Sequence, residues 1–364
     1  MKIFKVFLLS SLFLAVFSVS ASAEAPQQNE DFFKEFTEII PNGVIDAENP
    51  EEVLSEIGMD SLLSEIISAI SENQSKGISF FFILLGVAVF FALSETSPTD
   101  SLAFARQISG GVAAVSSLII FSAIRPVVEN VAGSLRELSL FFSSLMPVIT
   151  GITLAGGGVN SASVQAFNMN LTLSVVGKVA SSLLIPLSMS LFSLALLSAF
   201  DSGGISAVSK NIKGFFMWSL GIGCTVVIGV VSMQSMIASA SDTAYLRAAK
   251  YAASGMIPIV GSTVSSALAT LAGGLSYIRS AVGVSAVTVI VVMSMSPLVA
   301  LLIYRLAFSL CLSVLEFMGS SGGVRVFSAF RTAFDTIISI YVISVVVYIT
   351  EIVIFMKCGV EVFG

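Results

Sequence analysis

The chain has 364 residues, of which 55% are hydrophobic and 11% are charged, and its mean hydropathy is +0.98. A water-soluble protein of this length needs more polar surface than this composition supplies, so the composition excludes a soluble globular domain and indicates a membrane protein. The formal net charge is −6 and histidine is absent. Without histidine, the chain cannot form Ser-His or Cys-His nucleophile pairs or an HExxH zinc site.

The N-terminus has the pattern of a secretory signal peptide. Lys2 and Lys5 form a charged start, residues 7–19 form a short apolar core, and Ala21-Ser22-Ala23 is a small-residue cleavage site. The apolar core is too short to span a bilayer. The pattern therefore predicts a signal peptide over residues 1–23 with cleavage after Ala23, and an uncleaved anchor is the alternative.

Residues 24–77 form an acidic segment with 13 acidic and 2 basic side chains. Acidic residues do little to resist translocation, so this segment is expected to be exported. Its second half has apolar residues at helical spacing, among them Leu63 and Ile67, and predicts an amphipathic helix. We expect these two residues to dock on the membrane part or on a partner protein, or to pack within the segment itself.

The rest of the chain predicts an all-α, polytopic membrane bundle of about seven to eight transmembrane helices. Each helix satisfies its backbone hydrogen bonds internally, as the hydrocarbon core of a membrane requires. The proposed spans are 78–95, 108–124, 138–156, 171–200, 215–237, 255–277, 282–310 and 335–356. Polar links, the clearest at 125–137, 238–250 and 320–334, separate them. Residues 78–107 hold the first helix and a link, and residues 335–364 hold the last helix and a tail.

The membrane part is predicted to be internally duplicated, with repeats at 108–216 and 217–334. Landmarks recur 111 positions apart: Arg136 with Arg247, Pro147 with Pro258, and Pro186 with Pro297. Leu-Ala-Gly-Gly (154–157 and 271–274) and Ser-Gly-Gly (202–204 and 321–323) recur with small shifts. The copies are either inverted or parallel in the membrane. Inverted copies place Gly157 and Gly274 on opposite sides of the membrane, whereas parallel copies place them on the same side.

The repeated proline and glycine positions are candidates for a passage or for hinges. Proline frees a backbone carbonyl and glycine permits sharp turns, and transporters use such helix breaks to build a site at the bilayer midplane. Ordinary membrane proteins use them as hinges. The candidates are Pro147, Gly156, Gly157, Pro186, Pro258, Gly273, Gly274 and Pro297.

Ionisable residues inside spans are costly and are therefore functional candidates. Lys178 and Glu351 are the intramembrane charges that we single out. Asn160, Gln165, Asn168 and Asn170 form a polar stretch, for which a solvated loop is favoured over the wall of a water-filled cavity. The sequence has no phosphate-binding loop, dinucleotide fingerprint or basic nucleic-acid stripe, so we expect no catalytic residue, no metal site, no cofactor and no nucleic-acid partner.

The order of these features resembles the stage III sporulation protein AE family of endospore-forming Firmicutes. The resemblance is carried by the signal peptide, the acidic segment, Met-Ile-Pro-Ile-Val-Gly-Ser-Thr (256–263), Thr-Leu-Ala-Gly-Gly (270–274), and the stretch from Arg325 to Arg331 before a last apolar span. It covers essentially the whole chain, and none of these motifs is catalytic.

The resemblance implies a multi-pass protein of the mother-cell membrane that surrounds the forespore, with its N-terminal segment exported into the intermembrane space. It implies a subunit of a channel or secretion-like complex, with ring-forming membrane subunits, an ATPase encoded with it and a forespore-side protein as partners. The alternative is a self-sufficient secondary transporter with a midplane site at the paired Pro/Gly breaks.

Overall fold

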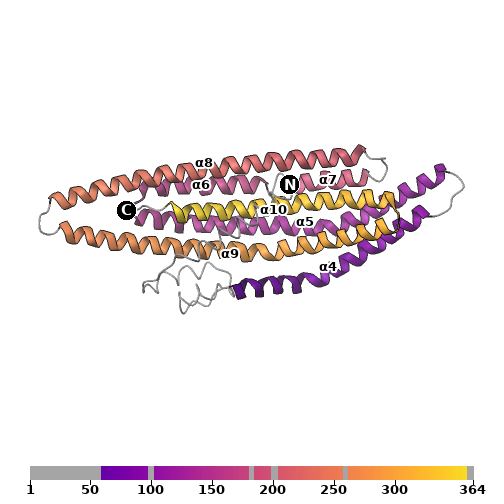
Figure 1. Ribbon diagram of the computed structural model, residues 1–364, viewed down its shortest axis with the longest axis horizontal. Helices are drawn as coiled ribbons and strands as arrows, with labels where there is room; N and C mark the ends of the chain where they lie inside the picture. Colours follow the sequence, from indigo (N-terminus) through magenta and orange to yellow (C-terminus); the bar gives the residue numbers. More distant parts are fainter. Residues whose placement is uncertain (1–58, 97–101, 180–183, 198–203, 257–260, 359–364) are drawn as a thin grey trace.

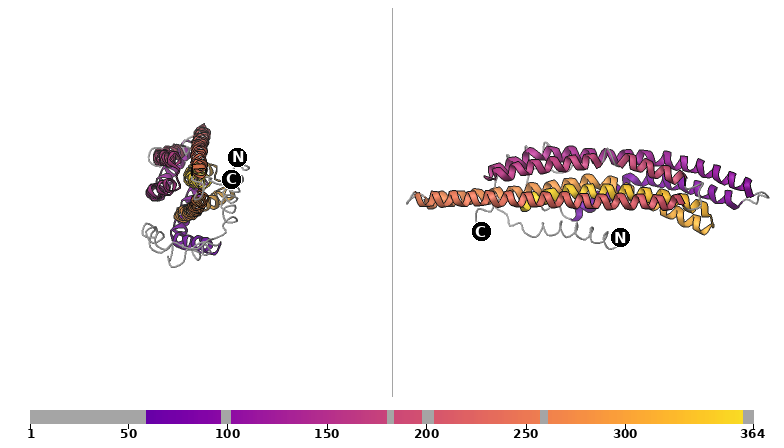
Figure 2. Two further views of the ribbon diagram at one scale, coloured as in Figure 1. Left: turned by 90° about the vertical axis from the view of Figure 1, so that its left-hand side faces the viewer. Right: turned by 90° about the horizontal axis from the view of Figure 1, so that it is seen from above.

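A computed structural model describes residues 59–96, 102–179, 184–197, 204–256 and 261–358, and every element within these ranges is an α-helix. The predicted all-α class is confirmed. The helices are α4 (Met59–Thr96), α5 (Leu102–Ala155), α6 (Val159–Lys178), α7 (Ile185–Leu197), α8 (Gly204–Met256), α9 (Gly261–Phe317) and α10 (Ser321–Lys357). They lie along one long axis and form an elongated bundle (Figures 1 and 2). The signal peptide with Ala23, and Pro258, lie outside the described residues.

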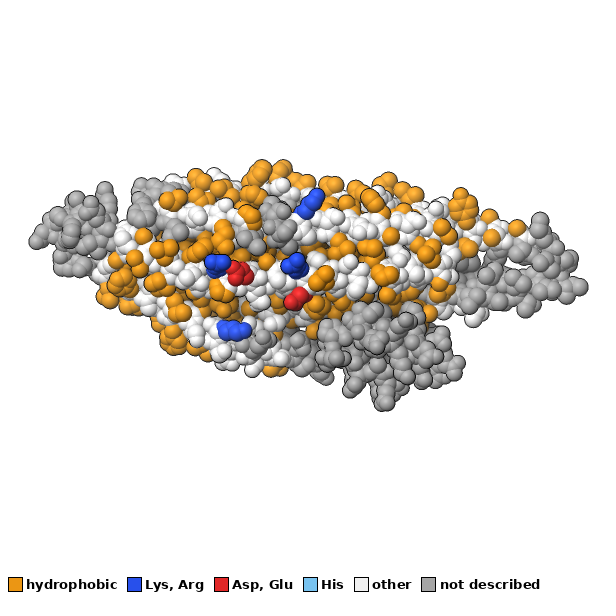
Figure 3. Space-filling model, turned by 180° about the vertical axis from the view of Figure 1, so that it is seen from behind, with side chains coloured by type: hydrophobic (Ala, Val, Ile, Leu, Met, Phe, Trp, Pro, Cys, Tyr) orange, Lys and Arg blue, Asp and Glu red, His pale blue; other side chains and the backbone are white. Residues whose placement is uncertain are grey.

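Five of the described helices contain stretches long and apolar enough to cross a membrane. The stretches are Ile67–Glu95, Gly110–Ala155, Asn211–Ala249, Gly274–Phe317 and Ser321–Lys357. A shorter apolar helix covers Pro186–Ala195. The surface is consistent with membrane-spanning helices, because hydrophobic side chains are spread over the face shown in Figure 3 and charged side chains are few there. The membrane-helix character is therefore supported, but the number of candidate spans is smaller than the seven to eight expected.

The number differs because links that were expected between spans are helical. The expected spans 108–124 and 138–156 fall in one helix, α5, which ends at Ala155. Its 54 residues extend about 80 Å, far beyond a hydrocarbon core of about 30 Å. The expected link at 125–137 lies inside α5, although Pro126 begins this stretch.

A buried stripe explains why α5 continues through its charged middle. Buried side chains recur every three or four residues, which is the spacing of one helix face. They are Ile120, Ile124, Val127, Val131, Ser134, Leu138, Phe142, Leu145, Ile149 and Ile152. Because the stripe does not stop between 125 and 137, the tertiary packing that stabilises the helix does not stop there either.

Helix α10 is the centre of the bundle, and it contacts each of the other six described helices. Its buried positions also recur at three to four residues, and they include the fully buried rings of Phe327, Phe330 and Phe334. Two tyrosines link it to α5: Tyr341 OH lies 3.1 Å from Ser134 Oγ, and Tyr348 OH lies 2.7 Å from Ser139 Oγ.

Helix α4 runs in the same direction as α9 and packs along it (Figure 1). The Phe80 ring lies 4.5 Å from the Tyr304 ring, and Asn73 Nδ2 donates to Ser296 Oγ at 3.4 Å. Near the start of the helix, Ala69 is buried while Ile67 is 65% exposed. The predicted apolar stripe therefore belongs to the same helix as the first span, and Ile67 is exposed on the described part of the chain. Whether it docks on a partner or packs within the exported segment stays a prediction. The side chain of Leu63 lies outside the described part.

The predicted domain boundaries do not coincide with helix ends. The boundaries at 77/78, 107/108, 216/217 and 334/335 fall inside α4, α5, α8 and α10. The turn at Gly156 lies beside the stretch of α9 that contains Gly274, since a Cβ on Gly156 would lie 4.0 Å from Leu275 Cδ1. The duplication, and whether its copies are inverted or parallel, stay predictions.

Gly77 lies where α4 approaches α9 closely and provides a test of this packing. A Cβ at Gly77 would overlap Ile303 Cγ2, whereas a Cβ at Gly86, on the same helix, would meet nothing within 4 Å. We expect Gly77→Ala to destabilise the protein by about 1–3 kcal/mol, because Ile303 is branched at Cβ and cannot move aside freely.

The measurement is thermal unfolding of the purified protein in detergent. Unfolding is detected by the reaction of the Cys311 thiol, which is fully buried in the folded protein. Gly86→Ala is the matched control, and its melting temperature should equal or slightly exceed that of the unchanged protein. Equal melting temperatures for the two variants would contradict the α4–α9 contact.

Candidate functional site

Helix α6 has an inverted polarity that marks the candidate site. Gln165, Asn168 and Thr172 are 5%, 0% and 1% exposed, whereas Phe167 on another side of the helix is 57% exposed. The spacing of three and four residues places the three polar side chains on one face. The buried face of α6 also includes Met169 and Val176, so the three polar side chains form a polar strip within it, and such buried polar groups in a membrane bundle are functional candidates. The solvated loop expected for this stretch is wrong, because the residues form a helix and two of the four polar side chains are buried.

Glu351, on α10, faces this polar side of α6. Its side chain is 3% exposed, and its Oε1 accepts from Gln165 Nε2 at 3.0 Å while its Oε2 lies 3.5 Å from Thr172 Oγ1. Among the described residues it has no ion-pair partner within 4.0 Å. A buried carboxyl that is held only by neutral groups is costly to keep charged.

Arg279, on α9, is the nearest buried cation along this region, and it has other partners. Its Nη2 donates to Thr153 Oγ1 at 3.4 Å, and its guanidinium carbon lies 5.2 Å from the centre of the Phe355 ring. Cys358, at the C-terminal cap of α10, lies in the field of both charges. Burial raises the pKa of the Cys358 thiol, Arg279 opposes this and Glu351 adds to it.

Asp242 fixes the N-terminus of α6 from the neighbouring helix α8. Its Oδ1 accepts from the backbone N–H of Asn160 at 3.2 Å and its Oδ2 from that of Ser161 at 2.7 Å. The carboxylate thereby satisfies two backbone donors that the first turn of a helix leaves free, and it complements the positive end of the helix dipole. The side chain is 3% exposed, so this cap lies inside the bundle.

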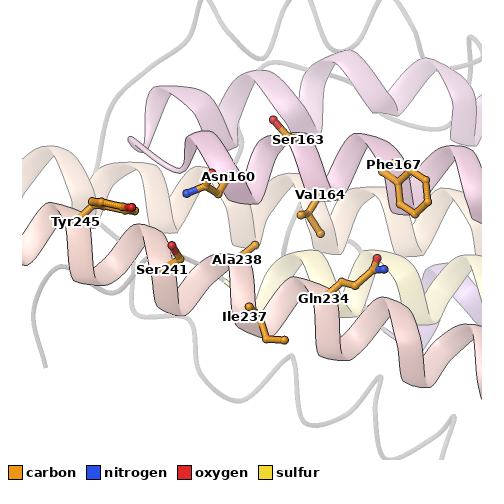
Figure 4. Close-up of a pocket in the computed structure, with 9 residues that line it drawn as sticks. All are labelled: Asn160, Ser163, Val164, Phe167, Gln234, Ile237, Ala238, Ser241 and Tyr245. Atoms are coloured by element: carbon orange, nitrogen blue, oxygen red, sulfur yellow. The ribbon is translucent and has the colours of Figure 1, made fainter.

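A groove of about 630 Å³ lies between α6 and α8 beside these residues. Figure 4 shows side chains of α6, including Asn160 and Phe167, next to side chains of α8, including Gln234 and Tyr245. Three buried polar atoms at the α6–α8 interface have no hydrogen-bond partner among the described protein atoms. They are Ser161 Oγ, Asn168 Oδ1 and Gln234 Oε1. Buried polar atoms of this kind are normally satisfied by ordered water.

The site is thus a polar interior at the end of the bundle where α5 turns into α6 (Figure 1). We call the following set the polar interior: Thr153, Ser161, Gln165, Asn168, Thr172, Ser235, Asp242, Arg279 and Glu351. It draws on α5, α6, α8, α9 and α10. The described residues contain no group of three or more His, Cys, Asp or Glu side chains that could hold a metal ion.

The two predicted intramembrane charges have different environments. Glu351 is buried in the polar interior, whereas Lys178, the last residue of α6, is exposed. A second set of charges joins α8, α9 and α10: Asp335 accepts from Arg305 Nε at 2.6 Å and lies 3.7 Å from Lys213 Nζ. Sequence reasoning did not pair these three residues, since they are far apart along the chain.

Among the repeated proline and glycine positions that the structure describes, Gly156 and Gly157 lie in a turn, whereas the others lie within helices. Gly156 and Gly157 form the turn between α5 and α6, where Gly157 has a φ of 78° that favours glycine. Gly273 and Gly274, their predicted counterparts, lie inside α9. Pro147 and Pro297 lie inside α5 and α9, the first exposed and the second buried, and Pro186 is an exposed residue in the first turn of α7.

Most of the chain matches a known protein family. The family model described as stage III sporulation protein AE matches residues 40–359. The stage III sporulation protein AE of Bacillus subtilis (strain 168) is 18% identical to this chain over 203 residues, which is 56% of this chain and 51% of that protein. The match therefore spans about half the length of that relative. No solved structure matches the chain significantly.

The tertiary cap on α6 can be tested by removing the Asp242 carboxylate. We expect Asp242→Ala to cost about 0.5–2 kcal/mol and to raise the rate of amide hydrogen exchange at Asn160 and Ser161, because both N–H groups lose their acceptor. Hydrogen exchange with mass spectrometry on the detergent-solubilised protein measures this effect. Glu129→Ala is the control, since Glu129 forms an exposed ion pair with Arg125 on α5 and its loss should change little. Unchanged exchange at Asn160 and Ser161 would contradict the cap.

Proposed function

The chain belongs to the stage III sporulation protein AE family, and from this premise we propose that it is a non-enzymatic core subunit of a sporulation-specific transenvelope channel that links the mother cell to the forespore. Family membership is the observation that carries this proposal. The subunit would be a multi-pass protein of the mother-cell membrane around the forespore, with its N-terminal segment in the intermembrane space. It would be needed for forespore development.

The distribution of polarity in the bundle supports a role within the membrane. The outer surface presents large apolar side chains, among them Phe215, Trp218 and Met233 of α8, which are 66%, 67% and 64% exposed. The polar interior is enclosed by five helices at the same time. A water-soluble protein has the opposite arrangement, with polar side chains outside and apolar ones inside. The arrangement here suits a chain surrounded by lipid or by other membrane subunits.

The packing of the polar interior supports a subunit rather than a pore made by one chain. The side chains that compose it are between 0% and 7% exposed, so this region is packed too closely to hold a passage wider than single water molecules. A passage for solutes would then arise between this chain and other subunits, or between copies of it. The partners that we propose are ring-forming membrane subunits, an ATPase encoded with this protein and a forespore-side protein.

A self-sufficient secondary transporter is the less favoured function. That function was proposed on the basis of paired Pro/Gly breaks that meet at a midplane site. Pro147 and Pro186 are exposed, and Gly273 and Gly274 are part of the continuous helix α9. The described positions therefore support the subunit more than the transporter.

The start of α4 is the proposed docking site for a partner. Ile67 is 65% exposed and Ala69, two residues later, is 3% exposed, so the two positions form a matched pair on one helix. We expect a photo-crosslinking amino acid at position 67 to capture other channel subunits in sporulating cells, detected by mass spectrometry. The same amino acid at position 69 should capture only segments of this chain. Exclusive self-contacts at position 67 would contradict docking at this site.

Dependence on partners can be tested with the purified protein in liposomes. As a channel subunit, the chain alone should not accumulate solutes when an ion gradient is imposed, because it lacks the remaining subunits. The measurement is uptake of labelled amino acids, sugars and nucleotides, with empty liposomes as the control. Uptake driven by the gradient alone would refute the subunit proposal and support the transporter.

A further inference from the structure

The buried carboxyl of Glu351 has an environment that no packing role explains. Its two oxygens face an amide and a hydroxyl, Gln165 Nε2 at 3.0 Å and Thr172 Oγ1 at 3.5 Å, and both groups come from the polar face of α6. An apolar side chain of similar volume would pack in a membrane bundle without any desolvation cost. A carboxyl at 3% exposure therefore indicates that the site uses its chemistry.

We propose that Glu351 is a proton-binding site that is reached by water from the groove between α6 and α8. A proton on Oε2 would donate to Thr172 Oγ1, while Oε1 would keep the hydrogen bond from Gln165. This arrangement satisfies both oxygens and leaves no net charge in the interior. The proposal concerns the chain itself and does not depend on the proposed function.

The ionisable groups around Glu351 do not neutralise it. From α9, Arg279 is engaged by Thr153 and by the Phe355 ring. From α8, Asp242 is negative and is engaged by the backbone of α6. On α10 itself, Tyr348 is hydrogen-bonded to Ser139 and Cys358 lies at the cap.

The described residues of the remaining helices form no ion pair with Glu351. Residues 159–177 of α6 and all of α7 contain no ionisable side chain. The nearest ionisable residues of α5 to the Ser139–Tyr348 contact are Arg136 and Glu137, both of which are exposed. On α4, Glu95 accepts from the backbone of Gly322, at the opposite end of α10. The charge of Glu351 is therefore set by whether a proton is bound to it.

The access route is indicated by buried oxygens that lack a protein partner. Asn168 lies on α6 between Gln165 and Thr172, is fully buried, and donates through Nδ2 to Ser235 Oγ at 3.0 Å while its Oδ1 has no partner. Gln234, which lines the groove, also has an Oε1 without a partner. A file of water that bonds to these two oxygens would connect the groove to the face of α6 that holds Glu351.

Infrared spectroscopy of the purified full-length protein in lipid nanodiscs tests the site. A protonated carboxyl absorbs at a C=O stretch that is separate from that of a carboxylate. We expect a carboxylic-acid band in the unchanged protein that is missing from Glu351→Gln and that disappears at alkaline pH, falling about tenfold per pH unit above its midpoint. Glu129→Gln, at an exposed ion pair, should keep the band. A band that E351Q leaves unchanged, or no carboxylic-acid band at neutral pH, where exposed carboxyl groups are ionised, would overturn the proposal.

Transfer into D₂O tests the route. The band of Glu351 should shift quickly, and Asn168→Leu should slow the shift at least tenfold because it removes the buried oxygen. Asn170→Leu is the matched control, since Asn170 lies on the same helix, is exposed and bonds to Ala166. Equal rates in the two variants would overturn the route through Asn168.

Labelling with a hydrophobic carbodiimide gives a second measurement that does not require E351Q to fold. This reagent modifies protonated carboxyl groups in apolar surroundings, and peptide mass spectrometry locates the modified residue. We expect modification of Glu351 that decreases as the pH rises and that sodium ions do not prevent. Protection by sodium at constant pH would assign the site to a cation instead, and modification only after denaturation would show that no proton reaches it in the fold. Either result would overturn the proposal.

Discussion

The burial of α10 on all sides is the constraint on which the rest of the bundle depends. This helix contacts every other described helix. Its side chains therefore pack against apolar neighbours along most of its length and form hydrogen bonds with polar neighbours near its C-terminal end. The apolar side chains include the aromatic rings of Phe327, Phe330 and Phe334. Tyr348 and Glu351 form the hydrogen bonds, to α5 and α6.

Helix ends in this bundle are capped by carboxylates from other helices. Asp242 of α8 caps α6, and Glu95 of α4 accepts from the backbone N–H of Gly322 at the start of α10, at 2.9 Å. Local capping residues act within one turn, whereas these two also tie neighbouring helices together. Ser320 adds a local cap to α10 through Gly323. Asp242 and Glu95, which the sequence alone would place at the surface, therefore stabilise contacts between helices.

The polar interior combines this fixed geometry with a buried carboxyl, Glu351, that has no counter-ion among the described residues and is held only by side chains of α6. Asp242 holds α6 in position, and α6 presents Gln165 and Thr172 to Glu351. Movement of α6 would therefore change the surroundings of the carboxyl, and a change in its charge would alter its contacts with α6. The two effects are linked because the same hydrogen bonds carry both.

The sequence alone determined the class of the protein, because hydropathy and helical spacing depend only on residues that are close together along the chain. It identified the all-α membrane character and the family, and it singled out Glu351 as a charge within an apolar helix. It also contained the uninterrupted stripe of α5 from Ile120 to Ile152, which predicts one helix where two spans were expected.

Only the tertiary structure decided which polar side chains are buried. Asn168 and Asn170 are two residues apart in the same polar stretch, yet one is fully buried and the other is exposed. The contact of Gly77 with Ile303, the cap that Asp242 provides and the neighbours of Glu351 all join residues that are more than 80 positions apart, with the Glu351 contacts spanning 179 and 186 positions. Such contacts depend on how the helices are rotated and ordered in the bundle, which no local pattern specifies.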